Sequence, residues 1–505
     1  MAAGVWLPRS AWSQVRWTTD PFALGVASGS PTHNTVVIWT RLVPSGGLGD
    51  DAIAVRWELA HDAGFKQLAQ TGQTSAAAQL GYSVHVELNG LEPDRWYHYR
   101  FMVAEVVSAI GRTRTFPAPG TPAQRLRLAY ASCQRWDHGY YSAYRHMLAD
   151  EPDAVLFLGD YIYEYPGSVN AVRQPTGGWV LTLDDYRARY ALHKSDPHLQ
   201  AMHAACPWLV TWDDHEVQND YAGLRPGDSG PPVANFAQRR AAAYQAYYEN
   251  MPLRSSVLTQ SLGGMAQGAE MRIYGRVAFG SLATIYLLDD RQYRNPPACT
   301  KGGRPGSSTL DPASCSAWHD PLRSFLGAAQ EQWLDQAFGK AGPGWNVVGQ
   351  QTVFGQRDFR SGPQELMSND GWDGYAPARA RFLASMQRQQ LANPVFLGGD
   401  VHANWVGHVK ADYAHPASPA IGVEFCGTSI SSNGGSNDRL VAQLQENPHF
   451  IYANRERRGY GVVEFTPARL TTTLRAVLDV RQEQSGIETL ASFVVEAGRP
   501  VIIPG

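Results

Sequence analysis

From residue 125 onward, short apolar segments alternate with segments of helical character, and this alternation restricts the possible folds more than any other feature. Such a pattern is typical of a layered α/β domain, in which helices cover the faces of a sheet. Near the C-terminus, predicted strands follow one another without helices. We therefore predict one α/β domain over residues 125–505. Its predicted strands are residues 127–132, 154–158, 208–212, 283–288, 345–348, 395–397, 421–425, 461–465 and 470–476, and its helices include residues 140–150, 235–249 and 328–337.

Residues 20–118 show a different pattern, in which short alternating strands are separated by turns and no helix is indicated. Regularly spaced strands over about 100 residues indicate a β-sandwich. The proline-rich segment 116–122 follows. We predict that it is a stiff linker, because proline fixes φ and lacks a backbone donor. The strands of the sandwich are predicted at residues 35–40, 54–59, 82–88 and 96–101.

Polar side chains follow five of the predicted strands of the α/β domain. In open α/β sheets, functional sites gather outside the carboxyl ends of the strands, so these side chains should converge on one edge. Each motif alone is also typical of a turn, a helix start, a buried cysteine or a core tyrosine. Together they would bury several carboxylates, which is unfavourable without a cation, and we therefore predict a metal site. The motifs are Cys133, Gly159-Asp160-Tyr161-Ile162-Tyr163, Asp213-Asp214-His215-Glu216 with Asn219, Asp289-Asp290-Arg291 and Gly398-Gly399-Asp400-Val401-His402.

Charge and hydropathy exclude two classes of protein. The chain has 43 Lys and Arg residues against 46 Asp and Glu residues, so it lacks the basic surplus that nucleic-acid binding requires. No run of 18 apolar residues is present, and no transmembrane helix is expected. Residues 1–19 start with small and apolar residues that resemble the end of a signal peptide, although an ordinary frayed terminus is the alternative. We therefore predict an exported protein, periplasmic or secreted, and leave its oligomeric state open.

The five cysteines fall into three groups. Cys299 and Cys315 flank a segment rich in Gly, Pro and Ser, and we predict a disulfide between them, with two free thiols as the alternative. Cys206 and Cys426 adjoin apolar segments and are predicted to be buried. Cys133 remains, and it lies beside the predicted metal site.

Several of these segments resemble the motif set of PhoD-type alkaline phosphatases, in the same order along the chain. The resemblance extends from segment 20–29 to the C-terminal strands. It implies a fibronectin-like β-sandwich followed by a four-layer αββα metallophosphoesterase domain. It also implies export by the twin-arginine route, although the sequence lacks the twin-arginine segment itself. The matching segments are Ser132-Cys133-Gln134, Gly159-Asp160-Tyr161-Ile162-Tyr163-Glu164, Trp212-Asp213-Asp214-His215-Glu216-Val217 and Gly399-Asp400-Val401-His402.

The resemblance also implies two metal sites. The implied ligands of the first, a ferric ion, offer thiolate, carboxylate, phenolate and imidazole groups, a mixture that suits a transition metal. The second site shares one carboxylate with the first and has only oxygen ligands, which suit a hard cation such as Ca²⁺. Its choice between two adjacent aspartates stays open. The ferric ligands are Cys133, Asp160, Tyr163 and His402, and the second set is Asp160, Asp214 or Asp213, Asn219 and Asp400.

The function implied is metal-assisted hydrolysis of small phosphomonoesters at alkaline pH. His215 is the candidate for contacting the phosphate or protonating the leaving group. Arg291 could brace a phosphate oxygen through its planar guanidinium group, or form only a surface salt bridge with Asp289 or Asp290. Two alternatives remain. One is a phosphodiesterase, including a phospholipase D-like enzyme that cleaves phospholipids, and the other is an exported binding protein whose α/β domain is inert.

Overall fold

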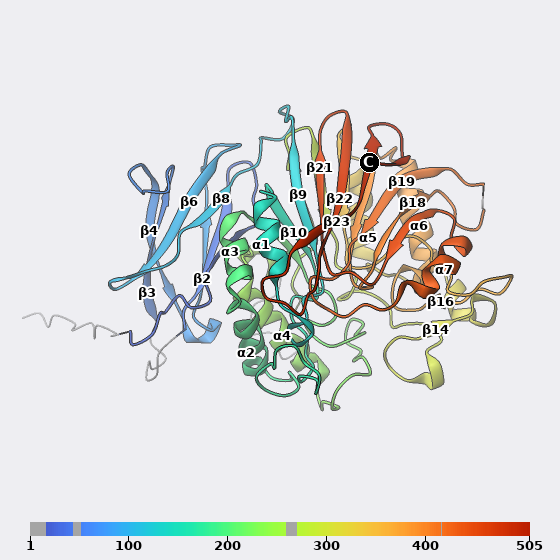
Figure 1. Cartoon of the computed structure of the whole chain (residues 1–505), viewed down its shortest axis with the longest axis horizontal. Coiled ribbons are helices and arrows are strands. Elements are labelled where there is room, and N and C mark those ends of the chain that lie inside the picture. Colours follow the sequence, from blue (N-terminus) through green and yellow to red (C-terminus); the bar gives the residue numbers. More distant parts are fainter. Residues whose placement is uncertain (1–16, 44–51, 259–269, 416) are drawn as a thin grey trace, which may run out of the picture.

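Two β-sheets pack face to face, and helices cover both outer faces (Figure 1). The structure, a computed structural model, describes residues 17–43, 52–258, 270–415 and 417–505. This arrangement confirms the predicted four-layer αββα architecture. From edge to edge, the first sheet contains β24 (Ile502–Pro504), β23 (Ile487–Glu496), β22 (Arg469–Val477), β21 (Gly459–Phe465), β9 (Leu126–Ala131), β10 (Ala154–Leu158), β11 (Trp208–Thr211), β1 (Val26–Gly29), β2 (Val36–Arg41) and β5 (Ser83–Leu88).

The second sheet has seven strands, and its four central neighbours from β13 to β19 are parallel. From edge to edge it contains β12 (Gly275–Phe279), β13 (Ala283–Leu287), β15 (Trp345–Gly349), β17 (Pro394–Gly398), β19 (Ala420–Cys426), β18 (Asn404–Lys410) and β20 (Phe450–Asn454). The ten-stranded sheet is covered by α1 (Ser142–Ala149), α2 (Leu183–Lys194), α3 (Pro197–Ala205) and α4 (Phe236–Asn250), and the seven-stranded sheet by α5 (Ala328–Phe338) and α6 (Ala376–Arg388).

The alternation of side chains along the central strands produces the four layers. In β10, Leu156 and Leu158 point into the core between the two sheets, whereas Val155 and Phe157 pack against the helices. Strands buried on both faces have continuous apolar sequences, unlike strands with one wet face. This is why the central strands could be predicted from the sequence within one or two residues.

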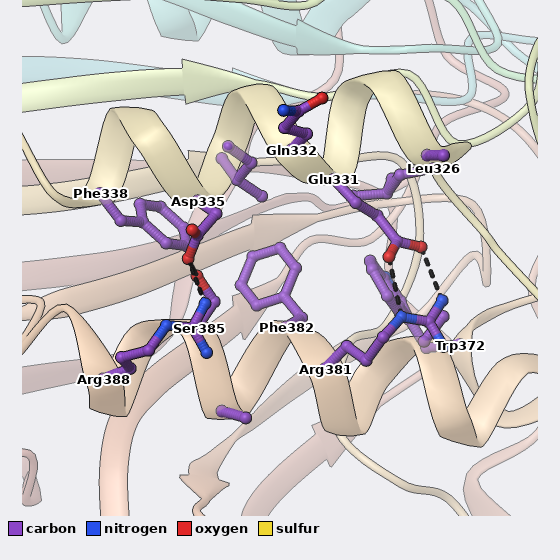
Figure 2. Close-up of a pocket in the computed structure, with 14 residues that line it drawn as sticks. Leu326, Glu331, Gln332, Asp335, Phe338, Trp372, Arg381, Phe382, Ser385 and Arg388 are labelled. Atoms are coloured by element: carbon purple, nitrogen blue, oxygen red, sulfur yellow. Dashed lines mark hydrogen bonds and ion pairs between the residues drawn. The ribbon is translucent and has the colours of Figure 1, made fainter. Parts of the chain in front are cut away.

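The α5 and α6 helices lie side by side on the outer face of the seven-stranded sheet, with a groove between them (Figure 2). Phe338 and Phe382 meet there, with ring centroids 5.6 Å apart. Arg381 pairs with Glu331 at 2.8 Å across the two helices, and a second ion pair joins Arg388 to Asp335. Because such partly exposed pairs contribute little, apolar contact holds this layer together.

The N-terminal region is a β-sandwich, as predicted, but it is not separate from the α/β domain. β1 pairs in parallel with β11, where Gly29 lies opposite Trp208. The sandwich half formed by β1, β2 and β5 therefore continues the ten-stranded sheet. Side chains from both halves fill a core of their own. The other half contains β4 (Leu68–Ala76), β3 (Ile53–Ala60), β6 (Trp96–Val103), β7 (Val106–Val107) and β8 (Gly111–Arg114).

The predicted stiff linker, residues 116–122, contacts the α/β domain near both of its ends. Phe116 is buried, and its ring lies 5.0 Å from that of Phe279. The Ser281 N–H donates to the Thr121 carbonyl at 2.8 Å. Burial of this aromatic ring fixes the segment along the α/β domain, so prolines here reduce the freedom of the unfolded chain without separating two bodies.

The cysteine predictions are confirmed. Cys299 and Cys315 form a disulfide, with Cα atoms 6.0 Å apart, and Cys206 and Cys426 are buried free thiols. The disulfide loop contains β14 (Thr309–Leu310). This strand pairs with β16 (Met367–Ser368), which lies outside the loop, over a small apolar cluster. None of the helices in the described ranges is long and apolar enough to cross a membrane. Most of the predicted signal remnant lies outside the described residues.

Candidate functional site

Four predicted site residues lie at the same position relative to four strands. Cys133 comes two residues after β9 ends, Asp160 two after β10, Asp213 two after β11 and Asp400 two after β17. The strands β9, β10 and β11 are parallel neighbours, so the first three side chains start from one edge of the ten-stranded sheet. Asp400 and His402 follow β17 of the other sheet, and they lie near the side chains that follow β9, β10 and β11. One ligand atom each from Cys133, Asp160 and His402 lies within 4.8 Å of the others.

The backbone turns sharply where these side chains leave their strands. Cys133, Asp160, Asp400 and His402 all have left-handed φ values, from 51° to 63°. This conformation is unfavourable for residues other than glycine, and it clusters at functional sites where the surrounding structure enforces it. The shared turn points to a site in which side-chain position matters more than local backbone stability.

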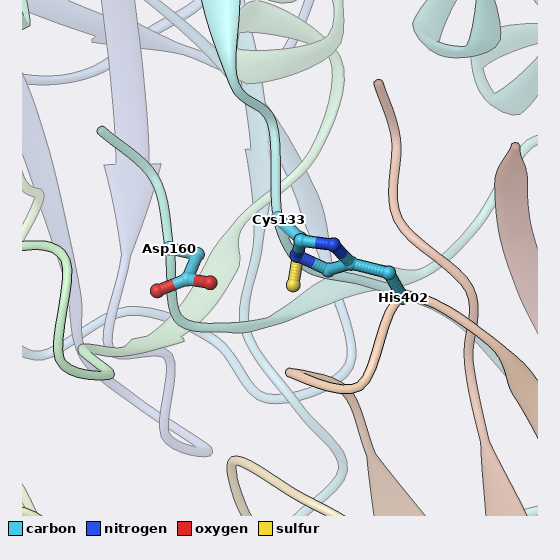
Figure 3. Close-up of side chains that lie close together, drawn as sticks. All are labelled: Cys133, Asp160 and His402. Atoms are coloured by element: carbon cyan, nitrogen blue, oxygen red, sulfur yellow. The ribbon is translucent and has the colours of Figure 1, made fainter. Parts of the chain in front are cut away.

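Cys133, Asp160, Tyr163 and His402 form what we call the thiolate set; Figure 3 shows three of its members converging. The Tyr163 hydroxyl donates to Asp160 Oδ2 at 2.9 Å and lies 3.2 Å from His402 Nε2. His402 Nδ1 lies 2.8 Å from the Asn433 carbonyl, to which it must donate, so the Nε2 lone pair faces the set. Burial lowers the pKa of His402 to about 3, which keeps the imidazole neutral and able to bind a metal.

Cys133 needs a cation to act as a thiolate. Burial, together with the nearby Asp160 carboxylate, raises the pKa of the Cys133 thiol well above its ordinary value. Burial and the same carboxylate also raise the pKa of the Tyr163 phenol. Metal ions deprotonate coordinating thiols and phenols by their own charge. A strongly charged transition-metal ion therefore fits this donor set.

A second group of carboxylates surrounds Arg291, and we call Asp213, Asp214, Asp370 and Asp400 the carboxylate set. Arg291 binds Asp213 through two nitrogens and Asp370 through Nη1, at 2.8 and 3.0 Å. Asp214 and Asp400 lie 3.8 and 3.7 Å from the guanidinium. Burial opposes the charge of Arg291, but these carboxylates outweigh it and raise its pKa. Thr352 also donates to Asp400, at 2.7 Å.

Some oxygens of this region have no hydrogen-bond partner among the described residues. They are Oδ1 of Asp214 and both oxygens of Asp290, all of them buried. Buried carboxylate oxygens are normally paired, so the free Asp214 Oδ1, which lies near Asp160, is available to a cation. Asp213 has both oxygens on Arg291, whereas Asp214 keeps one free, and this geometry favours Asp214 over Asp213 as a ligand.

His215 is held by Glu164 beside Asp160 and Asp214. His215 Nδ1 lies 2.7 Å from Glu164 Oε2, while the other oxygen of Glu164 accepts the Asn219 N–H at 2.8 Å. Burial opposes protonation, but Glu164 and Asp160 outweigh it and raise the pKa of His215 well above its ordinary value. One atom each of His215, Asp160 and Asp214 lies within 4.8 Å of the others. The site therefore has a cationic imidazole beside its carboxylates.

Arg291 is buried deeper than the sequence indicated. Only 1% of its surface is exposed, which rules out the alternative of a surface salt bridge. Its backbone N–H donates to Asp289 at 3.1 Å, and Asp290 lies 3.9 Å from its guanidinium. The strong contacts are instead with Asp213 and Asp370, so Arg291 links the loop after β11 to a loop far along the chain.

Three positioning carboxylates were missed by the sequence analysis. Glu216 accepts the backbone N–H groups of Asp160 at 3.1 Å and Asp213 at 2.8 Å, and so ties the loops after β10 and β11 together. Glu164 orients His215 as described. Both lie inside the quoted motifs, which was the available signal. Asp370 follows the two-residue strand β16 and has no such signal, because its loop shows no periodicity.

The comparisons with known proteins agree with this geometry. A family model described as PhoD-like phosphatase matches residues 128–474, and one described as PhoD-like phosphatase, N-terminal domain, matches residues 9–117. Alkaline phosphatase D of Bacillus subtilis (strain 168) is 42% identical over 492 residues, which covers 95% of this chain and 82% of that protein. A solved structure of PhoD superposes with a TM-score of 0.90 at 40% identity, covering 97% of this chain and 93% of the other. The fold, the placement of the site and these matches together show that the chain belongs to the PhoD-like phosphatase family and is a phosphoester hydrolase.

Proposed function

We propose that this protein is an exported, metal-dependent phosphatase that hydrolyses phosphomonoesters at alkaline pH. The observation that carries the proposal is the convergence of Cys133, Asp160 and His402, from three separate loops, beside an oxygen-only carboxylate set. The relative from Bacillus subtilis is named an alkaline phosphatase, which supports the monoester substrate and the pH range.

Two kinds of cation fit the two donor sets. The thiolate set would hold a ferric ion, and Asp160, Asp214, Asn219 and Asp400 would hold Ca²⁺. The free Oδ1 of Asp214 supports this assignment of the second site. When bound, such cations neutralise charge on the phosphoryl group and acidify water. Asp160 belongs to both sets, so it would keep the two cations close together.

The chain's own residues have two tasks in this reaction. His215, held through Nδ1 by Glu164, would contact the phosphate or keep a proton for the departing oxygen. Arg291 shares its guanidinium between Asp213 and Asp370, so direct contact with a phosphate would require one of these pairs to open. We propose that Arg291 instead holds the carboxylates in place.

A second candidate function is hydrolysis of phosphodiesters, including phospholipids. Half-buried aromatic side chains extend outward from His215 and would offer contact to a second ester group. The Tyr165 ring lies 5.2 Å from that of His215 and 5.3 Å from that of Trp179, and the Arg135 guanidinium lies 4.8 Å above Tyr165. Such a surface could bind an apolar alcohol portion that a simple monoester lacks.

Export to the periplasm or the medium is supported by the disulfide, because disulfides form and persist in oxidising compartments. The twin-arginine route, which carries folded proteins, is part of the same proposal. The near-neutral net charge of −3 supports small phosphate esters, and not nucleic acids, as the substrates.

The decisive experiment combines elemental analysis with turnover. Purified protein should contain stoichiometric iron and calcium and should hydrolyse a chromogenic phosphomonoester faster at pH 9 than at pH 7. A chromogenic diester, assayed on the same preparation, measures the second candidate activity. A preparation with bound metal that cleaves only the diester would reverse the order of the two candidates. A protein that does not bind either metal and does not cleave either ester would overturn the proposal.

A further inference from the structure

A short loop after β19 contacts the thiolate set. We call residues 429–433 the serine loop. It runs along the segment that carries Cys133: the Ile430 N–H donates to the Ser132 carbonyl at 3.0 Å, and the Ser432 N–H donates to the Cys133 carbonyl at 3.1 Å. The loop follows a strand end, as the metal-binding loops do, yet it contains no carboxylate, imidazole or thiol.

Ser432 contacts a ligand side chain directly. Its hydroxyl oxygen lies 2.8 Å from the Tyr163 oxygen and 2.8 Å from the Cys133 carbonyl, and it accepts the Arg135 N–H at 3.1 Å. Ser432 is fully buried, so no water competes for this hydroxyl. Its single proton can be given to only one of the two acceptors. A phenolate oxygen bound to a metal is a stronger acceptor than a backbone carbonyl. The Ser432 hydroxyl would therefore donate to Tyr163 and not to the Cys133 carbonyl when a metal is bound.

The same loop fixes a second ligand. The Asn433 carbonyl accepts the Nδ1 proton of His402 at 2.8 Å. Arg458, directly before β21, binds both the loop and this ligand. Its Nη1 donates to the Ser432 carbonyl at 2.8 Å, and its Nη2 donates to the His402 carbonyl at 3.0 Å. Two ligands that are 239 residues apart in sequence are therefore held by two adjacent loop residues.

We propose that Ser432 is a positioning residue that donates a hydrogen bond to the Tyr163 phenolate and thereby sets its orientation and its donor strength toward the metal. This inference rests on the proposed function. Hydrogen bonds to ligands tune metal affinity and redox potential, and losing one typically costs about 10- to 100-fold in affinity or activity. A phenolate without its donor carries more charge, which stabilises the ferric over the ferrous state.

The test compares three variants of the full chain. Ser432→Ala removes the donor, and Ser432→Thr keeps the hydroxyl. Ser431→Ala is the matched control, because the neighbouring Ser431 is equally buried but donates to the Arg135 carbonyl at 2.8 Å and to no ligand. Each protein is loaded with iron. Its metal content, its visible absorption band, its reduction potential and its unfolding midpoint are then measured.

The expected result is specific to Ser432→Ala. Its absorption band should shift, its potential should fall and its iron should dissociate about 10-fold faster, in line with the loss of one such partner. Ser431→Ala should bind and release iron as the wild type does, and Ser432→Thr should recover the wild-type band if the added methyl group is tolerated. The unfolding midpoint of Ser432→Ala shows whether a change in the band arises from general loosening.

Three outcomes would count against the inference. Ser432→Ala with an unchanged band and potential would overturn it, as would equal shifts in Ser431→Ala and Ser432→Ala. If wild-type protein binds iron but shows no phenolate band, Tyr163 is not a ligand and Ser432 has no such role. If wild-type protein binds no iron at all, the proposed function fails first, so the two failures can be told apart.

Discussion

The thiolate set and the neighbouring carboxylate set balance their charges in opposite ways. Cys133, Tyr163 and His402 are neutral without a metal, because burial raises the pKa of the first two and lowers that of the third. In the carboxylate set, burial would raise the pKa values of Asp214 and Asp370, but the counter-ions Arg291 and Arg294 outweigh it and lower them. Arg291 lies within 4 Å of five carboxylates, and Arg294 binds Asp370 at 2.8 Å.

This difference indicates how each cation is held. A metal entering the thiolate set must displace protons, and strong donors then retain it. A cation at the second site lies beside Arg291, which remains as a counter-ion for the carboxylates when the cation leaves. The first site should therefore exchange slowly and the second rapidly.

The largest effect is expected from Asp160→Asn, because this carboxylate is a proposed ligand of both cations. Removing one member of a catalytic unit typically lowers kcat by about 10³-fold or more, and we expect a loss of that size for the monoester. Both metals should be depleted, as measured by elemental analysis. The control is Asp479→Asn, whose carboxylate pairs with exposed Arg481 and accepts a hydrogen bond from Gln482. Loss of calcium alone would show that Asp160 does not bridge the sites.

Arg291→Met should have the next largest effect. It leaves five carboxylates without their central cation, and breaking a buried ion pair costs about 3–5 kcal/mol. The free energy of unfolding of the metal-free protein should fall by that amount, and added Ca²⁺ should restore part of it. Denaturant titration with and without Ca²⁺ measures both. Arg381→Met, at a partly exposed pair, should change stability by less than about 1 kcal/mol.

Chelation should separate the two sites without any mutation. A Ca²⁺-selective chelator should abolish most of the activity while the visible absorption of the iron remains, and added Ca²⁺ should restore turnover. Activity and absorbance are followed in the same cuvette. Parallel loss of both signals would contradict the difference in exchange rate between the sets.

Cys133→Ser should weaken only the thiolate set. We expect roughly 10- to 100-fold weaker iron binding together with a shifted absorption band, because a hard hydroxyl replaces a soft thiolate. Calcium affinity, measured by titration calorimetry, should change little. Cys206→Ser tests whether the loss of any buried thiol has the same effect, since that residue is equally buried but lies outside the site.

The smallest effect on activity is expected at Lys194, a buried amine whose neighbours are aromatic and not acidic. Its Nζ lies 4.3 Å from the ring centroid of Trp39, and no carboxylate of the described residues forms an ion pair with it. Burial lowers its pKa from 10.5 to about 7. Between these values the unfolded chain holds a proton that the folded protein has lost, so stability rises with pH across this window.

Lys194→Met should abolish that rise, whose slope is at most about 1.4 kcal/mol per pH unit, and should stabilise the protein at pH 7 without altering turnover. Unfolding curves recorded from pH 6 to pH 10 provide the measurement. An unchanged pH dependence would mean that Lys194 is charged in the folded protein. The contrast between Arg291, whose pKa is raised by carboxylate neighbours, and Lys194, whose pKa is lowered by burial, would then be wrong.

Much of this architecture was predictable because it depends on local patterns. Strands such as β10 are apolar on both faces, and ligands such as Asp160 follow them directly. Continuous apolar segments and the polar residues at their ends are visible in one dimension. The strand at residues 421–425 was also predicted, but as part of a C-terminal series. It is instead β19, which pairs with β17 in the other sheet, because strand order depends on contacts between distant segments.

Residue type, spacing and the order of short motifs were enough to predict the layered fold, the sandwich and the polar residues at the strand ends, and they favoured a disulfide over two free thiols. The contacts that these residues make became visible in the folded structure alone. Arg291 binds Asp213, whereas Asp214 keeps an oxygen without a partner. Asp370 and Ser432 also contact site residues, Arg291 and Tyr163. Those residues lie in irregular loops without periodicity. Their positions follow from long-range hydrogen bonds and burial, which exist only once the two sheets have packed together.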